Sequence, residues 1–280
     1  MRRAGWALVL CAVAGVGCER LLTGGDKPAA QTIARSLAPI ASSDGLIVDY
    51  ILLERPAGDP FLNRDLWTAA LPAGAPERRT LLVENGLRAG TLAGNVPTPF
   101  RTLIESESDT VKSHRSTFNN RKETVIPTAG PIDPCRFSVL ADLAGKPAPV
   151  ELKQANCGIL VRPQPTPDGR VRLWCEPQIQ HGDKRAWFRP NEDGTQFAKC
   201  EEVPLEKYPG LGFEVTLGPD DYLVIGWAAD EPDSLGSVLF AVEAQGRPRQ
   251  RLLVIRARQM APSGPNDLKP ITGPLMRSGK

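Results

Sequence analysis

Residues 158–180 read GILVRPQPTPDGRVRLWCEPQIQ, and this stretch decides the fold of the second half of the chain. Two apolar runs flank the Pro-Asp-Gly turn at 167–169, in which proline presets one dihedral angle and Asp-Gly tolerates positive φ. After the turn, apolar and polar side chains alternate, so that Leu173 and Cys175 share one face. The pattern predicts a long antiparallel hairpin that begins at about Cys157.

Strand and turn signals of the same kind continue toward the C-terminus. Apolar or alternating runs predict further strands at 135–143, 149–153, 213–217, 222–227, 237–243 and 251–257. Turn residues cluster at 191–194 and 218–221. We therefore expect a mainly antiparallel β domain over residues 131–260, followed by a polar, disordered tail at 261–280.

The first half of the chain predicts a different architecture. A strand over 45–55 is followed by Asp59 as a helix N-cap, a second short helix over 77–84 and the left-handed Asn85-Gly86 cap. A returning strand at 87–94 and a third helix at 98–105 complete the series.

The order strand, helix, helix, strand, helix predicts a small α/β module over residues 44–110. The polar stretch 106–120, which contains His114, is expected to be a loop, and residues 111–130 a linker. The predicted fold class of the whole chain is α+β.

The N-terminus has the features of an export signal. Arg2 and Arg3 precede an apolar run over 6–16, and small residues follow it. The run is shorter than the roughly 20 apolar residues that a membrane-spanning helix needs. Residues 1–17 are therefore predicted to be a signal peptide.

Gly15, Val16, Gly17 and Cys18 resemble a bacterial lipobox, although an aliphatic residue usually stands at the position of Gly15. The resemblance implies that Cys18 is acylated and anchors the chain to a membrane of the cell envelope. Residues 18–43, rich in small residues and proline, would be the tether. Ordinary secretion with cleavage nearby is the alternative, and the choice between inner and outer membrane stays open.

The charge balance excludes an electrostatic nucleic-acid binder. The chain has 34 basic and 32 acidic residues, and removal of the signal peptide would delete two arginines. The mature chain would then be neutral, so the lipid would have to supply the membrane attachment. With two histidines in the whole sequence, no cofactor or metal is expected.

Four cysteines remain after the signal peptide and the lipidation site: Cys135, Cys157, Cys175 and Cys200. An even number in an exported chain predicts two disulfides, and the sequence does not choose among the three pairings. Their wide spacing is unlike the close cysteine pairs of zinc sites.

Two pieces of the β domain resemble the β-domain of secretins, the ring proteins of bacterial secretion systems. One is the hairpin at 159–177, in which Ile-Leu-Val-Arg-Pro meets Val-Arg-Leu-Trp-Cys-Glu-Pro; the other is the pair of strands at 213–226 that ends in Ile225-Gly226. The Leu66-Trp67 pair and the Asn-Gly-Leu-Arg segment at 85–88 are also similar to segments of envelope lipoproteins. These resemblances imply a structural or assembly role, with envelope proteins or a second copy as partners.

The function expected from the sequence is non-enzymatic: structure, assembly or protein interaction at the envelope. A periplasmic ligand-binding protein is one alternative, with Trp174 and Trp187 lining a pocket. A hydrolase is another, since His181 and Asp183 flank Gly182, but no Gly-x-Ser-x-Gly elbow accompanies them.

The remaining carboxylates predict no active site. Glu201 and Glu202 would point to opposite faces of a strand. A cap is expected at Asp59, and solvated charges are expected at Asp49, Glu54 and Asp65.

Overall fold

The computed structural model describes residues 45–94, 96–105, 123–191, 193 and 195–259, together with the backbone of 112–118. The chain divides into two units, Met1–Ala41 and Ser42–Lys280, and every described residue belongs to the second. The predicted signal peptide, Cys18, the tether and the C-terminal tail lie outside the described residues.

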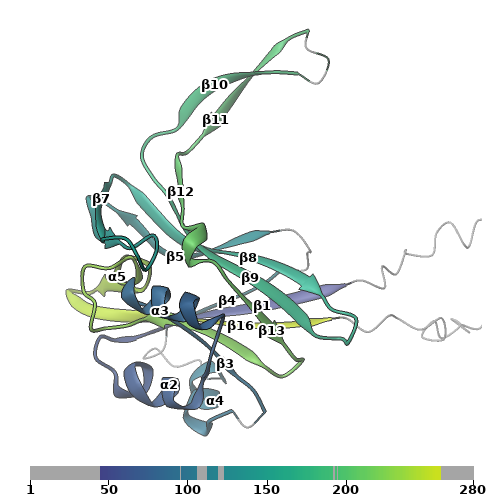
Figure 1. Ribbon diagram of the computed structural model, residues 1–280, viewed down its shortest axis with the longest axis vertical. Coiled ribbons are helices and arrows are strands. Elements are labelled where there is room, and N and C mark those ends of the chain that lie inside the picture. The colour runs from purple at the N-terminus through teal and green to yellow at the C-terminus, as the bar shows by residue number, and fades with distance from the viewer. Residues whose placement is uncertain are drawn as a thin grey trace, which may run out of the picture. The chain divides into compact units, whose positions relative to one another are not determined.

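A seven-stranded antiparallel sheet forms the centre of this unit (Figure 1). Its strand order is β2-β3-β14-β16-β1-β4, with β15 paired to β16 beside this path. The strands are β1 (Leu46–Pro56), β2 (Leu71–Pro72), β3 (Leu87–Leu92), β4 (Lys112–Phe118), β14 (Tyr222–Trp227), β15 (Ala241–Ala244) and β16 (Arg247–Gln259).

A five-stranded sheet with the order β12-β9-β8-β5, in which β13 also pairs with β9, accompanies it. Its strands are β5 (Thr124–Ile132), β8 (Ala155–Pro165), β9 (Val171–Gln180), β12 (Leu205–Lys207) and β13 (Phe213–Leu217). The predicted hairpin is confirmed, because β8 and β9 pair from Asn156↔Gln180 to Pro165↔Val171. Two hairpins complete the β structure: β6 (Cys135–Val139) with β7 (Ala148–Leu152), and β10 (Arg185–Pro190) with β11 (Phe197–Glu202).

The helices are short, and most begin where the sequence predicts. They are η1 (Phe61–Asp65, a π-helix), α2 (Leu66–Ala69), α3 (Pro76–Glu84), α4 (Thr98–Glu105), η2 (Pro209–Leu211) and α5 (Leu235–Phe240). The cap at Asp59 is confirmed, because its Oδ1 accepts hydrogen bonds from the backbone N–H groups of Phe61 and Leu62. Gly86 has a φ of 70°, as a left-handed cap requires.

The central sheet is buried on both faces, as the alternation of its side chains shows. On β1, Val48 belongs to a hydrophobic cluster shared with the five-stranded sheet. Leu53, on the opposite face, belongs to a second cluster that includes Leu66 of α2 and Phe100 of α4. A strand covered on both sides reads as a nearly continuous apolar run, which explains the composition of 45–55.

The fold class is α+β, as predicted, but two local expectations are wrong. The loop and linker expected between 106 and 130 contain β4, which pairs with β1, and β5, which pairs with β8. Instead of a single strand over 237–243, the chain forms α5 and then β15. Ser234 caps this helix, since its Oγ accepts a hydrogen bond from the backbone N–H of Ser237.

The module and the β domain expected from the sequence share the central sheet. The strand β16 lies between β14 and β1, and β14 in turn pairs with β3. The sheet therefore joins strands from both sides of the expected boundary near residue 110.

Candidate interaction surface

The β10–β11 hairpin extends beyond the five-stranded sheet (Figure 1). Its root is fixed by that sheet, because β9 ends at Gln180 and Leu205 of β12 pairs with it. The backbone N–H of His181 donates to Pro204 O at 2.9 Å, and that of Gly182 donates to Lys153 O at 2.7 Å. The hairpin is thus a continuation of the β9–β12 strand pair.

Three aromatic side chains of the hairpin face solvent. Trp187, Phe188 and Phe197 are 41%, 66% and 71% exposed. The register pairs Trp187 with Cys200 and Phe188 with Lys199. Because side chains alternate along a strand, Phe188 and Phe197 share one face and Trp187 lies on the other. Both faces of the hairpin therefore present apolar surface.

This exposure has an energetic consequence. Full burial of one large apolar side chain stabilises a contact by roughly 1.5–3 kcal/mol. An isolated two-stranded hairpin is at best marginally stable in water. The hairpin would gain stability, and lose exposed apolar surface, if a protein partner covered it.

The two strands differ in charge. Strand β10 carries Arg185 and Arg189, whereas β11 carries Glu201 and Glu202 beside a single lysine. That lysine, Lys199, already contacts Glu201 at 2.7 Å. Among the described residues each strand pairs only with the other, so each leaves one edge open. One edge is basic and the other mainly acidic.

The four candidate disulfide cysteines lie in different environments, and all four are free thiols in this structure. Cys135, Cys157 and Cys175 are buried, whereas Cys200 lies on the hairpin and is partly exposed. Cys135 and Cys157 are hydrogen-bonded to each other. Cys175 lies opposite Val161 of β8, and burial raises the pKa of its thiol. The two predicted disulfides stay a prediction.

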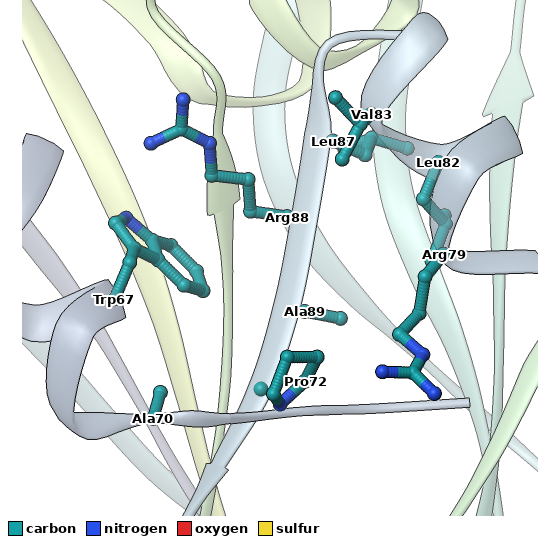
Figure 2. A pocket seen from close by; sticks show the side chains of 10 residues that line it. Trp67, Ala70, Pro72, Arg79, Leu82, Val83, Leu87, Arg88 and Ala89 are labelled. Carbon is teal, nitrogen blue, oxygen red and sulfur yellow. The ribbon is translucent and has the colours of Figure 1, made fainter. Parts of the chain in front are cut away.

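An apolar hollow lies beside β3, between α2 and α3 (Figure 2). Trp67 and Arg88 line it from one side of the strand and Arg79 from the other. The Arg88 guanidinium is already engaged, donating to Asn63 O at 3.0 Å and contacting Asp230 at 3.4 Å. The hollow encloses about 170 Å³. Small-molecule sites usually enclose about 300–1,000 Å³, so its size does not favour ligand binding.

The two tryptophans proposed to line a ligand pocket lie in different sheets. Trp174 is on β9, and its ring lies so close to Gly212 that a Cβ there would approach Cζ2 to 2.4 Å. Its indole N–H donates to Glu176 Oε2 at 3.4 Å. Trp187 is on the hairpin instead. Trp174 is therefore a partly buried residue that packs against Gly212.

The histidine of the hydrolase alternative has another neighbour. Nε2 of His181 lies 3.6 Å from Glu206 Oε1, so within the described residues the carboxylate beside it is that of Glu206 rather than Asp183. The other histidine, His114, belongs to β4, and only the backbone of that strand is described.

The carboxylates singled out in the first half differ in burial. Glu54 is buried between Arg249, at 2.9 Å, and Arg251, at 3.2 Å, so the expectation of a solvated charge there is wrong. Asp65 is exposed beside Arg64, as expected. Asp49 lies 3.9 Å from Arg258 and is partly exposed. Each carboxylate has a structural partner, since an arginine compensates its charge.

The described residues contain neither a metal-binding cluster nor a membrane-spanning helix. No group of three or more His, Cys, Asp or Glu side chains there is arranged to hold a metal ion. The helices of that part of the chain are also too short or too polar to cross a bilayer.

No protein-family model and no curated protein matches the sequence. The chain is similar to the InvG secretin domain β-barrel from the Salmonella SPI-1 injectisome NC-base, with TM-score 0.25 and 12% identity, covering 85% of this chain and 69% of that one. It is also similar to the V. cholerae type IV competence pilus secretin PilQ, with TM-score 0.23 and 13% identity, covering 81% and 63%.

These structural neighbours are secretin proteins, the family that residues 159–177 and 213–226 resemble. The TM-scores are low, so the function proposed below rests on the hairpin and on the sequence. By fold and site, the chain is an α+β protein with a projecting, aromatic-bearing hairpin.

The sequence predicts a turn between β10 and β11, but the sequence analysis did not identify this hairpin as an interaction surface. Two six-residue runs flank that turn, and each contains an exposed aromatic residue among charges. Charged and aromatic residues side by side on a strand indicate a segment whose apolar groups are not covered by its own chain. This composition could have identified the hairpin as an interaction surface from the sequence.

Proposed function

We propose that this chain is a non-enzymatic protein of the bacterial cell envelope, anchored through lipidated Cys18, whose β10–β11 hairpin joins it to a protein partner in an assembly. The observation that carries the proposal is the solvent exposure of Trp187, Phe188 and Phe197 on a hairpin with a fixed root. A monomeric protein rarely keeps such surface on a projecting element without a use for it.

The envelope location is supported by the N-terminal sequence. A basic start, an apolar run and the Gly-Val-Gly-Cys segment at 15–18 are typical of exported lipoproteins. The mature chain would be neutral, so acyl chains, rather than basic residues, would hold it at the bilayer.

The partner that the charges favour is a second copy. The basic edge of β10 in one copy would lie beside the mainly acidic edge of β11 in the next. Within one hairpin Arg185 lies opposite Glu202 in the strand register, and the same register would repeat between copies. A secretion-system-related assembly is the finer form of this proposal, in line with the secretin-like segments of the sequence.

Sedimentation of the detergent-solubilised full chain over a range of concentrations tests the proposal. We expect the wild type to associate and Phe188→Ser/Phe197→Ser to need at least ~100-fold higher concentration, because each ring contributes roughly 1.5–3 kcal/mol.

The matched control is Leu71→Ser/Leu143→Ser. These side chains are 64% and 48% exposed but lie outside the hairpin, so association should be unchanged. A wild type that stays monomeric at all concentrations would overturn self-association. Equal association by the Phe188→Ser/Phe197→Ser variant would show that another surface is responsible.

A further inference from the structure

The β6–β7 hairpin forms a two-stranded sheet of its own, and its Cys135, Phe137 and Leu152 side chains are buried in the hydrophobic cluster that it shares with the five-stranded sheet. Asn85 binds Leu140 through two hydrogen bonds, at 2.9 and 2.8 Å. The backbone N–H of Ser138 donates to Asp233 O at 2.8 Å. A hairpin of this kind has little stability alone, so any further link to the five-stranded sheet matters.

Cys135 begins β6, three residues after β5 ends at Ile132. The preceding strand, β5, runs beside β8, with Ala129 opposite Cys157 and Ile132 opposite Ala155. At Gly130 the two backbones are so close that a Cβ would lie 2.8 Å from Ala155 O.

The two thiols therefore meet in the core. Cys135 and Cys157 are fully or almost fully buried and belong to the same hydrophobic cluster. A hydrogen bond joins their side chains. Both thiols also act electrostatically on the partly buried Tyr208, whose ring centroid lies 6.3 Å from that of Phe137 of β6 in an edge-on arrangement. The hydrogen bond to Cys157 lowers the pKa of the Cys135 thiol.

We propose that Cys135 and Cys157 form a disulfide when the chain folds in an oxidising compartment, and that Cys175 and Cys200 remain thiols. The premise of export comes from the proposed function. As the S–S bond forms, the two thiols give up two electrons and two protons, and a disulfide acceptor such as oxidised glutathione or a disulfide-exchange protein becomes two thiols. Burial of both sulfurs places this step during folding.

The other two cysteines lie apart from this pair. Cys175 of β9 is held in register with Val161 and Phe213, and Cys200 is on the projecting hairpin opposite Trp187. A bond between them would require the β10–β11 hairpin to fold back onto β9.

The bond would also steady the interaction surface. The segment that it closes, 135–157, contains Lys153, whose carbonyl accepts the N–H of Gly182 at the root of the β10–β11 hairpin. A disulfide at this place would constrain the segment that binds Gly182 at that root.

Peptide mapping without reduction tests the pairing directly, because trypsin places each of the four cysteines from 135 to 200 in a separate peptide. Those for Cys135 and Cys157 span 123–136 and 154–170, and those for Cys175 and Cys200 span 173–184 and 200–207. After alkylation of the full chain isolated from cells, we expect the first two peptides to be linked and the other two to be alkylated. A link from Cys135 or Cys157 to Cys175 or Cys200 would overturn the proposal.

Refolding of the reduced full chain in a glutathione buffer tests the cysteine pairing independently of whether the chain is exported in cells. If the 135–157 link forms there but not in cells, the pairing holds and the export premise fails. If both thiols stay alkylatable in the refolded protein, the pairing itself is wrong.

Thermal unfolding gives a second readout. Reductant should lower the Tm of the oxidised wild type by about 5–10 °C. It should leave the Tm of Cys135→Ser/Cys157→Ser unchanged, and an equal shift in both would contradict a stabilising bond.

Discussion

Asp168 shows at the residue scale how the turn between β8 and β9 controls a carboxyl group. A hydrogen bond from the Thr166 hydroxyl, followed by one from the Arg170 guanidinium, lowers the pKa of Asp168 to about 2. Its ordinary value is 3.8. Because the folded pKa lies below the unfolded one, the ionised carboxyl stabilises the turn above about pH 4, and this contribution is lost as pH falls toward 2.

We predict that the Asp168 carboxyl titrates near pH 2 in an NMR titration, and that Thr166→Val moves its pKa up toward 3.8. The substitution removes the hydroxyl and keeps the shape of the side chain. A wild-type Asp168 that titrates at its ordinary value would contradict the geometry of the turn.

Asn85 has a structural role that its position after a helix does not reveal. Its amide N–H donates to Leu81 O and Leu140 O, and its Oδ1 accepts from the backbone N–H of Leu140 at 2.8 Å. The side chain is almost fully buried. It links α3 to the residue that follows β6.

Asn85→Ala should lower the free energy of unfolding by about 2–4 kcal/mol, because the buried backbone groups of Leu140 lose their partners. Urea denaturation measures this loss. Thr80→Ala, in which only an exposed hydrogen bond to Pro76 O is removed, serves as the control and should change stability by less than about 0.5 kcal/mol. An equal, small effect in both variants would contradict the assigned role.

Residue-scale predictions from the sequence succeeded where the interaction is local. The Asp59 cap and the Gly86 turn depend on neighbours within a few positions. Asn85 and Leu140, however, are 55 positions apart, and Glu54 and Arg251 are 197 apart. No local pattern contains such a partner, so the sequence predicts only a helix cap at Asn85 and a solvated charge at Glu54.

At the scale of elements, the charges of β10 and β11 make a sharp prediction about association. Arg185→Glu should weaken self-association, because copies would then bring carboxylates together, and Glu202→Arg should weaken it by bringing guanidinium groups together. An equimolar mixture of the two variants should restore it, since alternating copies pair opposite charges.

Sedimentation of each variant and of the mixture measures this effect. High salt should weaken association of the wild type, because exposed charges are screened. Two variants that associate as the wild type does, or a mixture that fails to recover, would contradict edge-to-edge pairing of the hairpins.

Element types were largely predictable, and the exceptions have physical reasons. The strand β1 and the hairpin β8–β9 have long, regular patterns. Because residues 112–118 are polar, the sequence did not predict β4. The strand lies at the edge of the sheet, where an apolar run is not needed. The apolar run after Ser234 is compatible with a strand as well as with a buried helix. The Ser234 cap and the burial of the run in the core stabilise the helix α5 instead.

At the scale of the whole molecule, β1 and β16 pair along their length although they come from opposite ends of the described chain. Both strands are buried on both faces, so their apolar composition indicates burial but does not show which strand each one pairs with. The expectation of a separate module and β domain follows from elements that are neighbours in the sequence. The central sheet instead depends on pairing between strands that are far apart in the sequence.

The proposed membrane anchor at Cys18 also concerns the whole molecule. Cys18→Ser should move the protein from the membrane fraction to the soluble fraction, because without acyl chains a neutral chain has no strong hold on a bilayer. Cys11→Ser is the matched control, since Cys11 would leave with the signal peptide, and it should stay membrane-bound. Retention of both variants in the membrane would argue against lipidation at Cys18.

Photo-crosslinking in intact cells tests the central claim most directly. A photoreactive amino acid at Phe188 should give a covalent adduct that contains two copies of this chain, whereas the same group at Leu143, also exposed, should give none. If the protein with the probe at Phe188 is present at the membrane and gives no protein adduct, the hairpin is not an assembly surface.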